Sequence, residues 1–282
     1  MTLQFPRKFY NALLRGIRNV LWLLQDGKIF RKELVLLDFQ LDIPFSPSHG
    51  YKVTYNSDGM TLLNSSECLE SPEFVRAYSA SLQVNDWRGM NGERMDMRWR
   101  YYVVLHYANA AKELPGDFVE CGVYKGGYSR AICEHLNLQA LNKTFYLFDT
   151  FEGLDPSQAN QSEIDSGLLE TYSGYDVVHL EALRETFRGF PVEFIKGSVP
   201  DSLSRVHIDS VAFLSIDMNM AAPEIAAANF FWDRISSGGV VLLDDYGFHA
   251  HAAQRKAFDE FAVEKKVRIF SLPTGQGVII KP

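Results

Sequence analysis

The 282-residue sequence has few of the features that mark several large classes of protein. Its three cysteines, Cys68, Cys121 and Cys133, form no Cys-x-x-Cys or His–Cys cluster, so they indicate neither a disulfide framework nor a zinc site. We therefore expect a reducing, cytoplasmic setting. Positive charge is also scarce. The formal net charge of -7 argues against nucleic acid as a partner, because phosphate binding requires a dense basic surface.

The first 33 residues differ in charge from the remainder. They hold seven Lys or Arg against two acids, a net charge of +5, so the rest of the chain carries -12. Apolar residues at helical spacing predict a basic amphipathic helix there. Its apolar stretch, Val20 to Leu24, is far shorter than the ~20 residues that span a bilayer. Two alternatives stay open: docking on a membrane surface, or packing on its own protein or in a homo-oligomer.

The remainder divides into an irregular part and a regularly alternating part. Residues 34–92 contain short apolar pieces and many turn formers, so we expect an N-terminal extension over residues 1–94 that ends in an irregular cap. In residues 95–282, strand and helix patterns alternate, which predicts an α/β domain with a mainly parallel sheet covered on both faces and a C-terminal antiparallel hairpin. The expected helices are 96–114, 128–136, 178–187, 223–232 and 251–263, and the expected strands are 118–121, 144–148, 192–195, 211–216, 240–243, 267–272 and 278–280.

Two of the expected strands end in acidic residues. Asp217 follows residues 211–216, and Asp244 and Asp245 follow residues 240–243. Ligands bind at the carboxyl edge of such sheets, where these acids should meet. Three carboxylates repel one another unless a cation or a shared proton compensates, and clustered oxygens favour a hard ion such as Mg²⁺. The three acids are therefore candidate metal ligands.

A glycine-rich loop lies between the first strand of the domain and its helix. It runs from Glu120 to Ser129 and contains Gly122, Gly126 and Gly127, which allow a tight turn and close approach of a ligand. The loop matches neither Gly-x-Gly-x-x-Gly nor Gly-x-x-x-x-Gly-Lys-Ser/Thr, so a pyrophosphate cofactor is not specifically supported. A plain strand-to-helix turn is the alternative.

The next two strand ends also bear on a cofactor. Asp149 ends the second strand, 29 residues after Glu120, where an acid can accept both hydroxyls of a ribose. This favours a nucleoside cofactor. Ser198 follows the third strand in a small polar turn that could pass beside an adenine ring, although taken alone it is better explained as a simple turn residue.

In their order and spacing, four segments resemble the macrocin O-methyltransferase (TylF-like) family of class I S-adenosylmethionine-dependent methyltransferases. The resemblance covers roughly residues 95–282. The segments are Phe-Val-Glu-Cys-Gly-Val-Tyr-Lys-Gly-Gly (118–127), Leu-Phe-Asp-Thr-Phe-Glu-Gly-Leu (147–154), Asp217, and Gly-Gly-Val-Val-Leu-Leu-Asp-Asp-Tyr-Gly (238–247).

The resemblance implies a Rossmann-like class I methyltransferase fold and Mg²⁺-dependent transfer of a methyl group to a hydroxyl, notably on a sugar. It implies that Gly122, Gly126 and Gly127 lie beside the methionine part of S-adenosylmethionine and that Asp149 holds the ribose. It also implies that the three acids at the strand ends bind the Mg²⁺. The last implication agrees with what the strand ends already indicate.

One position departs from the family pattern. The family often has a second acid, a proposed base, where this sequence has Asn219. An amide cannot take a proton, although it could orient a substrate or hydrogen-bond a metal-bound water. His249 and His251 lie just past the Asp244–Asp245 pair on a loop expected at the same edge, so either imidazole is a candidate proton acceptor.

Two other functions remain to be weighed. A nicotinamide-dependent oxidoreductase would share the sheet and the acid on the second strand, but the missing Gly-x-Gly-x-x-Gly and the Asp-Asp pair count against it. A binding domain that has lost catalysis is kept open by Asn219. A polar segment between Gly153 and Tyr175 follows the second strand, where a long loop acts as a lid or is a disordered connection.

Overall fold

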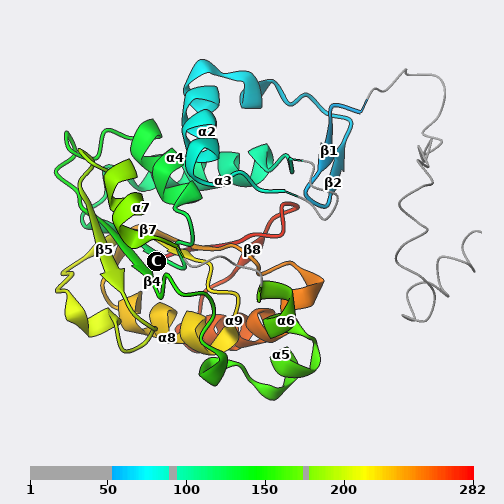
Figure 1. Ribbon diagram of the computed structural model, residues 1–282, viewed down its shortest axis with the longest axis vertical. Coiled ribbons are helices and arrows are strands. Elements are labelled where there is room, and N and C mark those ends of the chain that lie inside the picture. The colour runs from blue at the N-terminus through cyan, green and yellow to red at the C-terminus, as the bar shows by residue number, and fades with distance from the viewer. Residues whose placement is uncertain (1–52, 89–93, 174–177) are drawn as a thin grey trace, which may run out of the picture. The chain divides into compact units, whose positions relative to one another are not determined.

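The computed structural model describes residues 53–88, 94–173 and 178–282, all within one compact unit, Lys52–Pro282 (Figure 1). The basic helix expected in the first 33 residues lies outside this part of the chain. Within the described residues, no helix combines the length and apolar character needed to cross a membrane.

Among the described residues, the main sheet has seven strands in the order β5-β4-β3-β6-β7-β9-β8. Strands β3 to β7 are parallel to one another, whereas β9 runs antiparallel to both β7 and β8. The predicted mainly parallel sheet with a C-terminal antiparallel hairpin is confirmed. The strands are β3 Asp117–Cys121, β4 Phe145–Asp149, β5 Val192–Lys196, β6 Val211–Ile216, β7 Ile235–Leu243, β8 Phe270–Ser271 and β9 Gly277–Ile280.

Alternating side chains of the central strands build two hydrophobic cores. In β3, Phe118 joins the core on one face of the sheet and Val119 joins the core on the other. Phe213 and Leu214 divide in the same way in β6. Successive residues of a strand point to opposite faces, so a run that is apolar at every position requires both faces to be covered.

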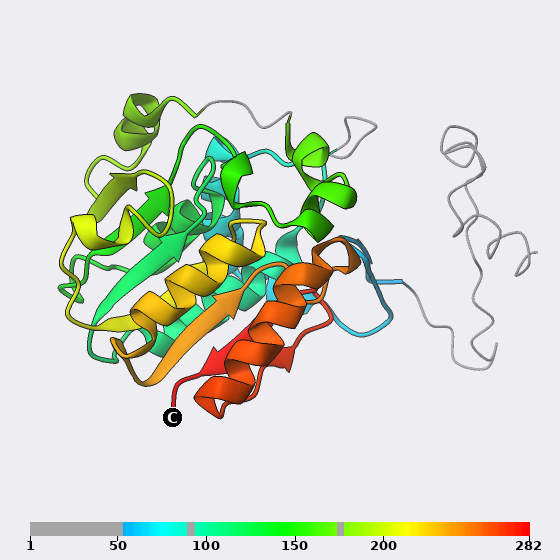
Figure 2. The same ribbon diagram turned by 90° about the horizontal axis from the view of Figure 1, so that it is seen from below.

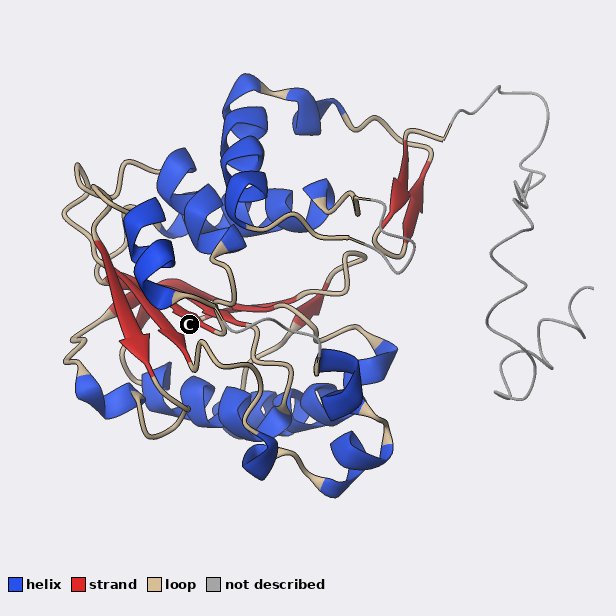
Figure 3. Cartoon of the chain, in the orientation of Figure 1, coloured by secondary structure: helices blue, strands red, loops and turns tan. Residues whose placement is uncertain are grey.

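Helices cover both faces, as Figures 2 and 3 show. Helices α3 and α4, with α2 packed on α4, lie on one side, and α8 and α9 lie on the other. Helix α7 lies in the segment between β4 and β5, and its Leu183 belongs to the same core as α3 and α4. The bounds of the long helices are α2 Pro72–Val84, α3 Arg98–Ala111, α4 Gly127–His135, α7 Leu180–Thr186, α8 Ala221–Trp232 and α9 Ala252–Lys265.

The expectation of an irregular cap over residues 34–92 is wrong for its described part. A small hairpin, β1 Tyr55–Ser57 with β2 Met60–Leu62, is followed by the 3-10 turn η2 Glu67–Glu70 and by the 13-residue helix α2. The polar segment after β4 is also folded over its described residues, 153–173, rather than a disordered connection. It contains the 3-10 turn η3 Pro156–Gln158 and the short helices α5 Gln161–Asp165 and α6 Leu168–Tyr172.

Candidate active site

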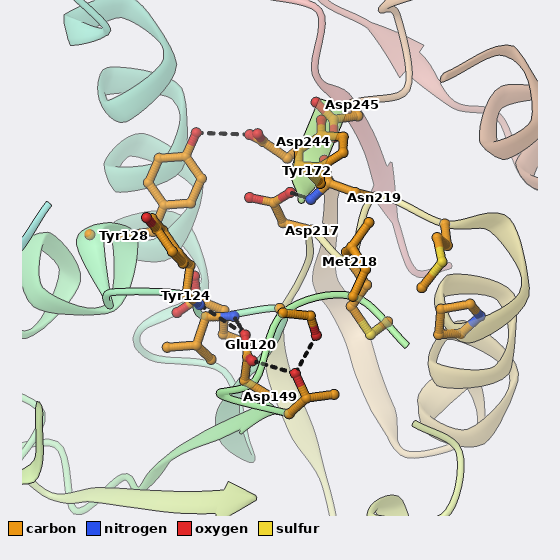
Figure 4. A pocket seen from close by; sticks show the side chains of 18 of the residues that line it. Glu120, Tyr124, Tyr128, Asp149, Tyr172, Asp217, Met218, Asn219, Asp244 and Asp245 are labelled. Carbon is orange, nitrogen blue, oxygen red and sulfur yellow. Dashed lines mark hydrogen bonds between the residues drawn. The ribbon is translucent and has the colours of Figure 1, made fainter. Parts of the chain in front are cut away.

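A cavity of about 620 Å³ opens at the carboxyl ends of β3, β4, β6 and β7. Its volume is in the range of small-molecule sites. Segments far apart in the sequence line it: the chain around α2 and α3, the glycine loop, the segment after β4, and both acid-bearing strand ends (Figure 4). The predicted site residues among the lining are Glu120, Gly122, Gly127, Asp149, Ser198, Asp217, Asn219, Asp244, Asp245 and His251.

The glycine loop passes so close to neighbouring elements that side chains are excluded at two positions. Gly122 has φ of +90°, and a Cβ there would lie 1.8 Å from the carbonyl oxygen of Asp217. A Cβ on Gly127, the first residue of α4, would lie 2.4 Å from the hydroxyl of Tyr101. The loop therefore lies directly against the end of β6, which brings the predicted cofactor loop next to the predicted metal ligands.

Glu120 is buried at the carboxyl end of β3 and accepts a short hydrogen bond from the Ser129 hydroxyl. Burial raises the pKa of Glu120 to about 8, although the Ser129 bond opposes the shift. A carboxyl group in this environment is held as the neutral acid near neutral pH. It can then donate as well as accept a hydrogen bond in the cavity.

Asp149 organises the loop that it faces. Its Oδ2 accepts the backbone N–H groups of Val123 at 2.6 Å and Tyr124 at 2.8 Å, and its Oδ1 accepts the N–H of Phe151 at 2.6 Å. A carboxylate has about four lone-pair sites, so these bonds leave little capacity free. The ribose contact predicted for Asp149 stays a prediction, to which the structure adds a clear loop-fixing role.

Ser198 connects β5 to the segment after β4. Its hydroxyl donates to Asp155 Oδ2 at 2.7 Å and accepts from Gln158 Nε2 at 2.6 Å. All three residues line the cavity. Ser198 therefore fixes the wall on the side where an adenine ring was predicted.

The three predicted metal ligands come together at the ends of β6 and β7 (Figure 4). Burial and the neighbouring Asp244 and Asp245 raise the pKa of Asp217 well above its usual range. Burial and Asp244 also raise the pKa of Asp245, to about 6. Burial is the larger cause of both shifts, and repulsion between the neighbouring carboxylates adds to it.

Asp244, by contrast, is fully engaged by protein donors. Its Oδ1 accepts from the Tyr128 hydroxyl at 2.8 Å (Figure 4). The same oxygen accepts from Gln276 Nε2 at 3.0 Å, and Oδ2 accepts from Arg100 Nη1 at 2.6 Å. Across the described ranges, no group of three or more His, Cys, Asp or Glu side chains is set to hold a metal ion as it stands. The acids therefore meet as predicted, but Asp244 is turned to other partners.

The two candidate histidines occupy different environments. His249 is exposed and is absent from the cavity lining, whereas His251 is buried and lines it. His251 Nε2 lies 3.1 Å from the Tyr172 hydroxyl and 3.6 Å from Asp245 Oδ2. Its buried Nδ1 has no hydrogen-bond partner within the part of the chain that the structure describes. One nitrogen of this imidazole is thus held by protein groups, and the other is buried without a partner among the described residues.

Asn219 lines the cavity with its backbone held in the left-handed region at φ of +61°. Its backbone N–H donates to Glu224 Oε1 at 3.0 Å, and its amide Nδ2 lies 3.4 Å from Asp217 Oδ1. Glu224 accepts the N–H of Met218 as well, so it fixes the turn that follows β6. Asn219 is therefore positioned beside Asp217 as a donor.

Sequence reasoning missed several polar residues at this site, of which Arg100, Tyr128 and Tyr172 line the cavity and Gln276 lies behind it against Asp244. Arg100, Tyr128 and Gln276 engage Asp244, and Tyr172 contacts His251. For Arg100, the helical spacing of the sequence held one indication of a buried role. Arg100 lies on the buried stripe of α3 together with Val104 and Ala108, where an unpaired charge would be unfavourable.

Comparison with known proteins adds a family match. The family model described as Macrocin-O-methyltransferase (TylF) matches residues 92–270, more than half of the chain. An 8-demethyl-8-(2,3-dimethoxy-alpha-L-rhamnosyl)-tetracenomycin-C 4'-O-methyltransferase of Streptomyces olivaceus is 30% identical over 149 residues, covering 50% of this chain and 56% of that protein. A demethyldecarbamoylnovobiocin O-methyltransferase of Streptomyces niveus is 28% identical over 142 residues, covering 47% and 53%. The chain thus spans about half the length of the curated relatives it matches.

Solved structures show the same fold. The O-methyltransferase NovP superimposes with a TM-score of 0.62 at 19% identity, covering 77% of this chain and 99% of that chain. A calicheamicin methyltransferase gives a TM-score of 0.54 at 15% identity, covering 74% and 93%. The fold is that of class I methyltransferases, as the sequence predicted.

Proposed function

The chain belongs to the macrocin O-methyltransferase (TylF) family, and we propose from this premise that it transfers a methyl group from S-adenosylmethionine to a hydroxyl of a sugar-bearing small molecule. The observation that carries the proposal is the single cavity shared by the glycine loop and the two acid-bearing strand ends. Support for a sugar comes from the relative named for a rhamnosyl tetracenomycin. The net charge of -7 and the three free cysteines also suit a small-molecule enzyme of a reducing, cytoplasmic setting.

The residues of the cofactor side fit a nucleoside bearing an amino acid. Gly122 leaves the loop backbone without a side chain where it faces the end of β6, and Gly127 does the same where the loop faces Tyr101 of α3. Asp149 and Ser198 line the same cavity, where Asp149 would hold the ribose, as the resemblance implies, and Ser198 would lie beside the adenine ring. Gly126, which the resemblance also implies for the cofactor loop, does not line the cavity. When bound, S-adenosylmethionine supplies the methyl group. The chain's part is to hold the acceptor oxygen in line with it, and such orientation lowers a barrier by roughly 7 to 11 kcal/mol in favourable cases.

The charges at the acid edge fit a divalent cation, which we propose is Mg²⁺ held by Asp217, Asp244 and Asp245. Repulsion from Asp244 and Asp245 contributes to the raised pKa of Asp217, so added positive charge would be favourable there. Binding through Asp244 requires Arg100 to release that carboxylate. The ion would act as a Lewis acid that makes the acceptor hydroxyl easier to deprotonate. Asn219, beside Asp217, would orient the same hydroxyl.

His251 is the proton acceptor that the geometry favours. Its Nε2 lies beside the Tyr172 hydroxyl and Asp245, and the imidazole lines the cavity, where it would take the hydroxyl proton as the oxygen–carbon bond forms. His249 lies two residues away on the same 3-10 turn, η5 His249–His251, but is exposed.

The proposed function is tested by methyl transfer. The full-length protein is incubated with S-adenosylmethionine carrying a labelled methyl group and with glycosylated small molecules, with Mg²⁺ or with EDTA. We expect label in an acceptor hydroxyl, and strongly reduced transfer in EDTA that excess Mg²⁺ restores. If S-adenosylmethionine does not bind at all, as measured by isothermal titration, the proposal fails. Undiminished transfer in EDTA would contradict the magnesium part alone.

The role of His251 is tested by paired substitutions. General base catalysis typically contributes about 100-fold to 10,000-fold to a rate, so we expect His251→Ala to lower kcat within that range. Affinity for S-adenosylmethionine should be little changed, because His251 is not on the glycine loop. His249→Ala is the matched control and should retain the wild-type kcat. Equal kcat values for the two variants would remove His251 as the base.

A further inference from the structure

The Arg100 guanidinium lies inside the acid edge itself. Its Nη1 contacts Asp244 Oδ2 at 2.6 Å and lies 3.9 Å from Asp245 Oδ1. The side chains are almost fully buried, 8% exposed for Arg100 and 4% for Asp244. A protein cation is therefore already in contact with one of the proposed metal ligands and close to a second.

Asp58 provides Arg100 with a second buried partner. Asp58 belongs to the turn between β1 and β2, and its two carboxylate oxygens accept from Arg100 Nε at 3.1 Å and Nη2 at 2.9 Å. The Phe248 ring lies against the same guanidinium, with its centroid 4.6 Å from Arg100 Cζ. Planar guanidinium pairs well with a carboxylate through two parallel hydrogen bonds. These contacts hold Arg100 independently of Asp244, so it can release Asp244 without becoming an unpaired buried charge.

We infer that Arg100 is the resident counter-cation of the acid edge and competes with a divalent ion for Asp244. The inference rests on the magnesium part of the proposed function. Asp58 is then a positioning residue that retains the guanidinium when Asp244 turns to the ion. Through this pair, the β1–β2 hairpin is coupled to metal binding, although the hairpin itself supplies no metal ligand. Arg100 sets how tightly the edge binds an ion, and it neither contacts the acceptor nor moves a proton.

The competition is measurable without turnover. Mn²⁺, a paramagnetic substitute for Mg²⁺, is titrated into the full chain, and the free ion is followed by electron paramagnetic resonance. Arg100→Met removes the competing charge while keeping an unbranched apolar stem. We expect its Kd for Mn²⁺ to fall by about tenfold to a hundredfold, the range expected for one charge-assisted hydrogen bond. Arg100→Lys, which retains a positive charge, should return the Kd toward the wild-type value.

A matched control and a double variant separate this effect from a general disturbance. Arg98 is on the same helix and pairs with Asp96 and Glu70. Arg98→Met should leave the Kd for Mn²⁺ unchanged. Because Arg100→Met leaves Asp58 buried without its partner, the variant can fail to fold. In Asp58→Asn combined with Arg100→Met, that unpaired charge is removed, and this protein should bind Mn²⁺ more tightly than Asp58→Asn alone.

Each outcome bears on a separate claim. If the wild type binds Mn²⁺ and removal of Arg100 leaves the Kd unchanged or raises it, in both the single and the double variant, the inference is overturned while the proposed function stands. If none of these proteins binds Mn²⁺, the magnesium part of the proposed function and the inference fail together. Methyl transfer, measured separately, then decides whether the rest of the proposed function survives.

Discussion

At the scale of single residues, Glu120 is a buried acid whose charge state should depend on folding. It is 2% exposed at the end of β3, and the Ser129 hydroxyl is its side-chain partner. Burial raises its pKa from 4.5 to about 8. Between these values the folded protein holds a proton that the unfolded chain has released. Its contribution to stability is therefore fully present below about pH 4.5 and is lost as pH rises through about 8.

Glu120→Gln should remove this dependence. An isosteric amide has no proton to lose, so the free energy of unfolding of the variant should fall less steeply between pH 5 and pH 8, by up to ~1.4 kcal/mol per pH unit. The measurement is urea unfolding of both proteins, without ligands, at a series of pH values. Glu193→Gln, at an exposed position on the edge strand β5, is the control and should follow the wild type. Parallel pH profiles for wild type and Glu120→Gln would show that Glu120 is ionised in the folded state.

The candidate site could be predicted from the sequence only where the backbone alone brings residues together. Asp217 and Asp244 follow adjacent parallel strands, and parallel strands end at one edge, so their meeting follows from the strand pattern. Arg100 reaches the same edge from α3, and Asp58 from a turn before it. Nothing in their local sequence fixes that approach, because it depends on how the helix packs on the sheet. The partners of Asp244 were therefore missed.

At the scale of elements, the strands and helices of the domain were predictable because their patterns are strong. The fully apolar run of β6 and the alternation of helix and strand patterns leave few other folds. Helix α2 was missed for a physical reason. Most of its buried side chains are small, namely Ala77, Ala80 and Ser81, with Phe74 the large exception, so its apolar periodicity is weak. Its N-terminal signal was present: Ser71 caps the helix and Pro72 follows.

In the segment between β4 and β5, the start of a helix follows from the local sequence, whereas the position of the segment depends on contacts with distant residues. A capping box between Asn160 and Glu163 begins α5, and that pattern is readable from the sequence. The contacts that hold the segment in place cannot be predicted from its sequence. Glu163 Oε1 accepts the backbone N–H of Ala221 at 2.8 Å, at the start of α8, and Tyr172 contacts His251. The segment is thus fixed to the acid edge by two contacts with residues far along the chain.

At the scale of the whole molecule, the described residues before α3 are integral to the fold and to the cavity. Phe74 and Ala77 of α2 and Leu69 before it are buried in the core shared with α3 and α4. Asp58 pairs with Arg100 inside the site. The division of the chain into residues 1–94 and 95–282 stays a prediction, and these contacts across residue 94 supply its test.

We expect a protein comprising residues 95–282 to be far less stable than one comprising residues 52–282. The shorter chain exposes core surface at about 1.5–3 kcal/mol for each large side chain lost, and it leaves Arg100 without Asp58, where breaking a buried pair costs about 3–5 kcal/mol. Together these losses approach the ~5–15 kcal/mol that stabilises a typical domain. Thermal unfolding followed by circular dichroism should give a cooperative transition for residues 52–282 and a greatly lowered or absent one for residues 95–282. Matching midpoints would show instead that the domain begins after residue 94 and that the β1–β2 hairpin and α2 are an added layer.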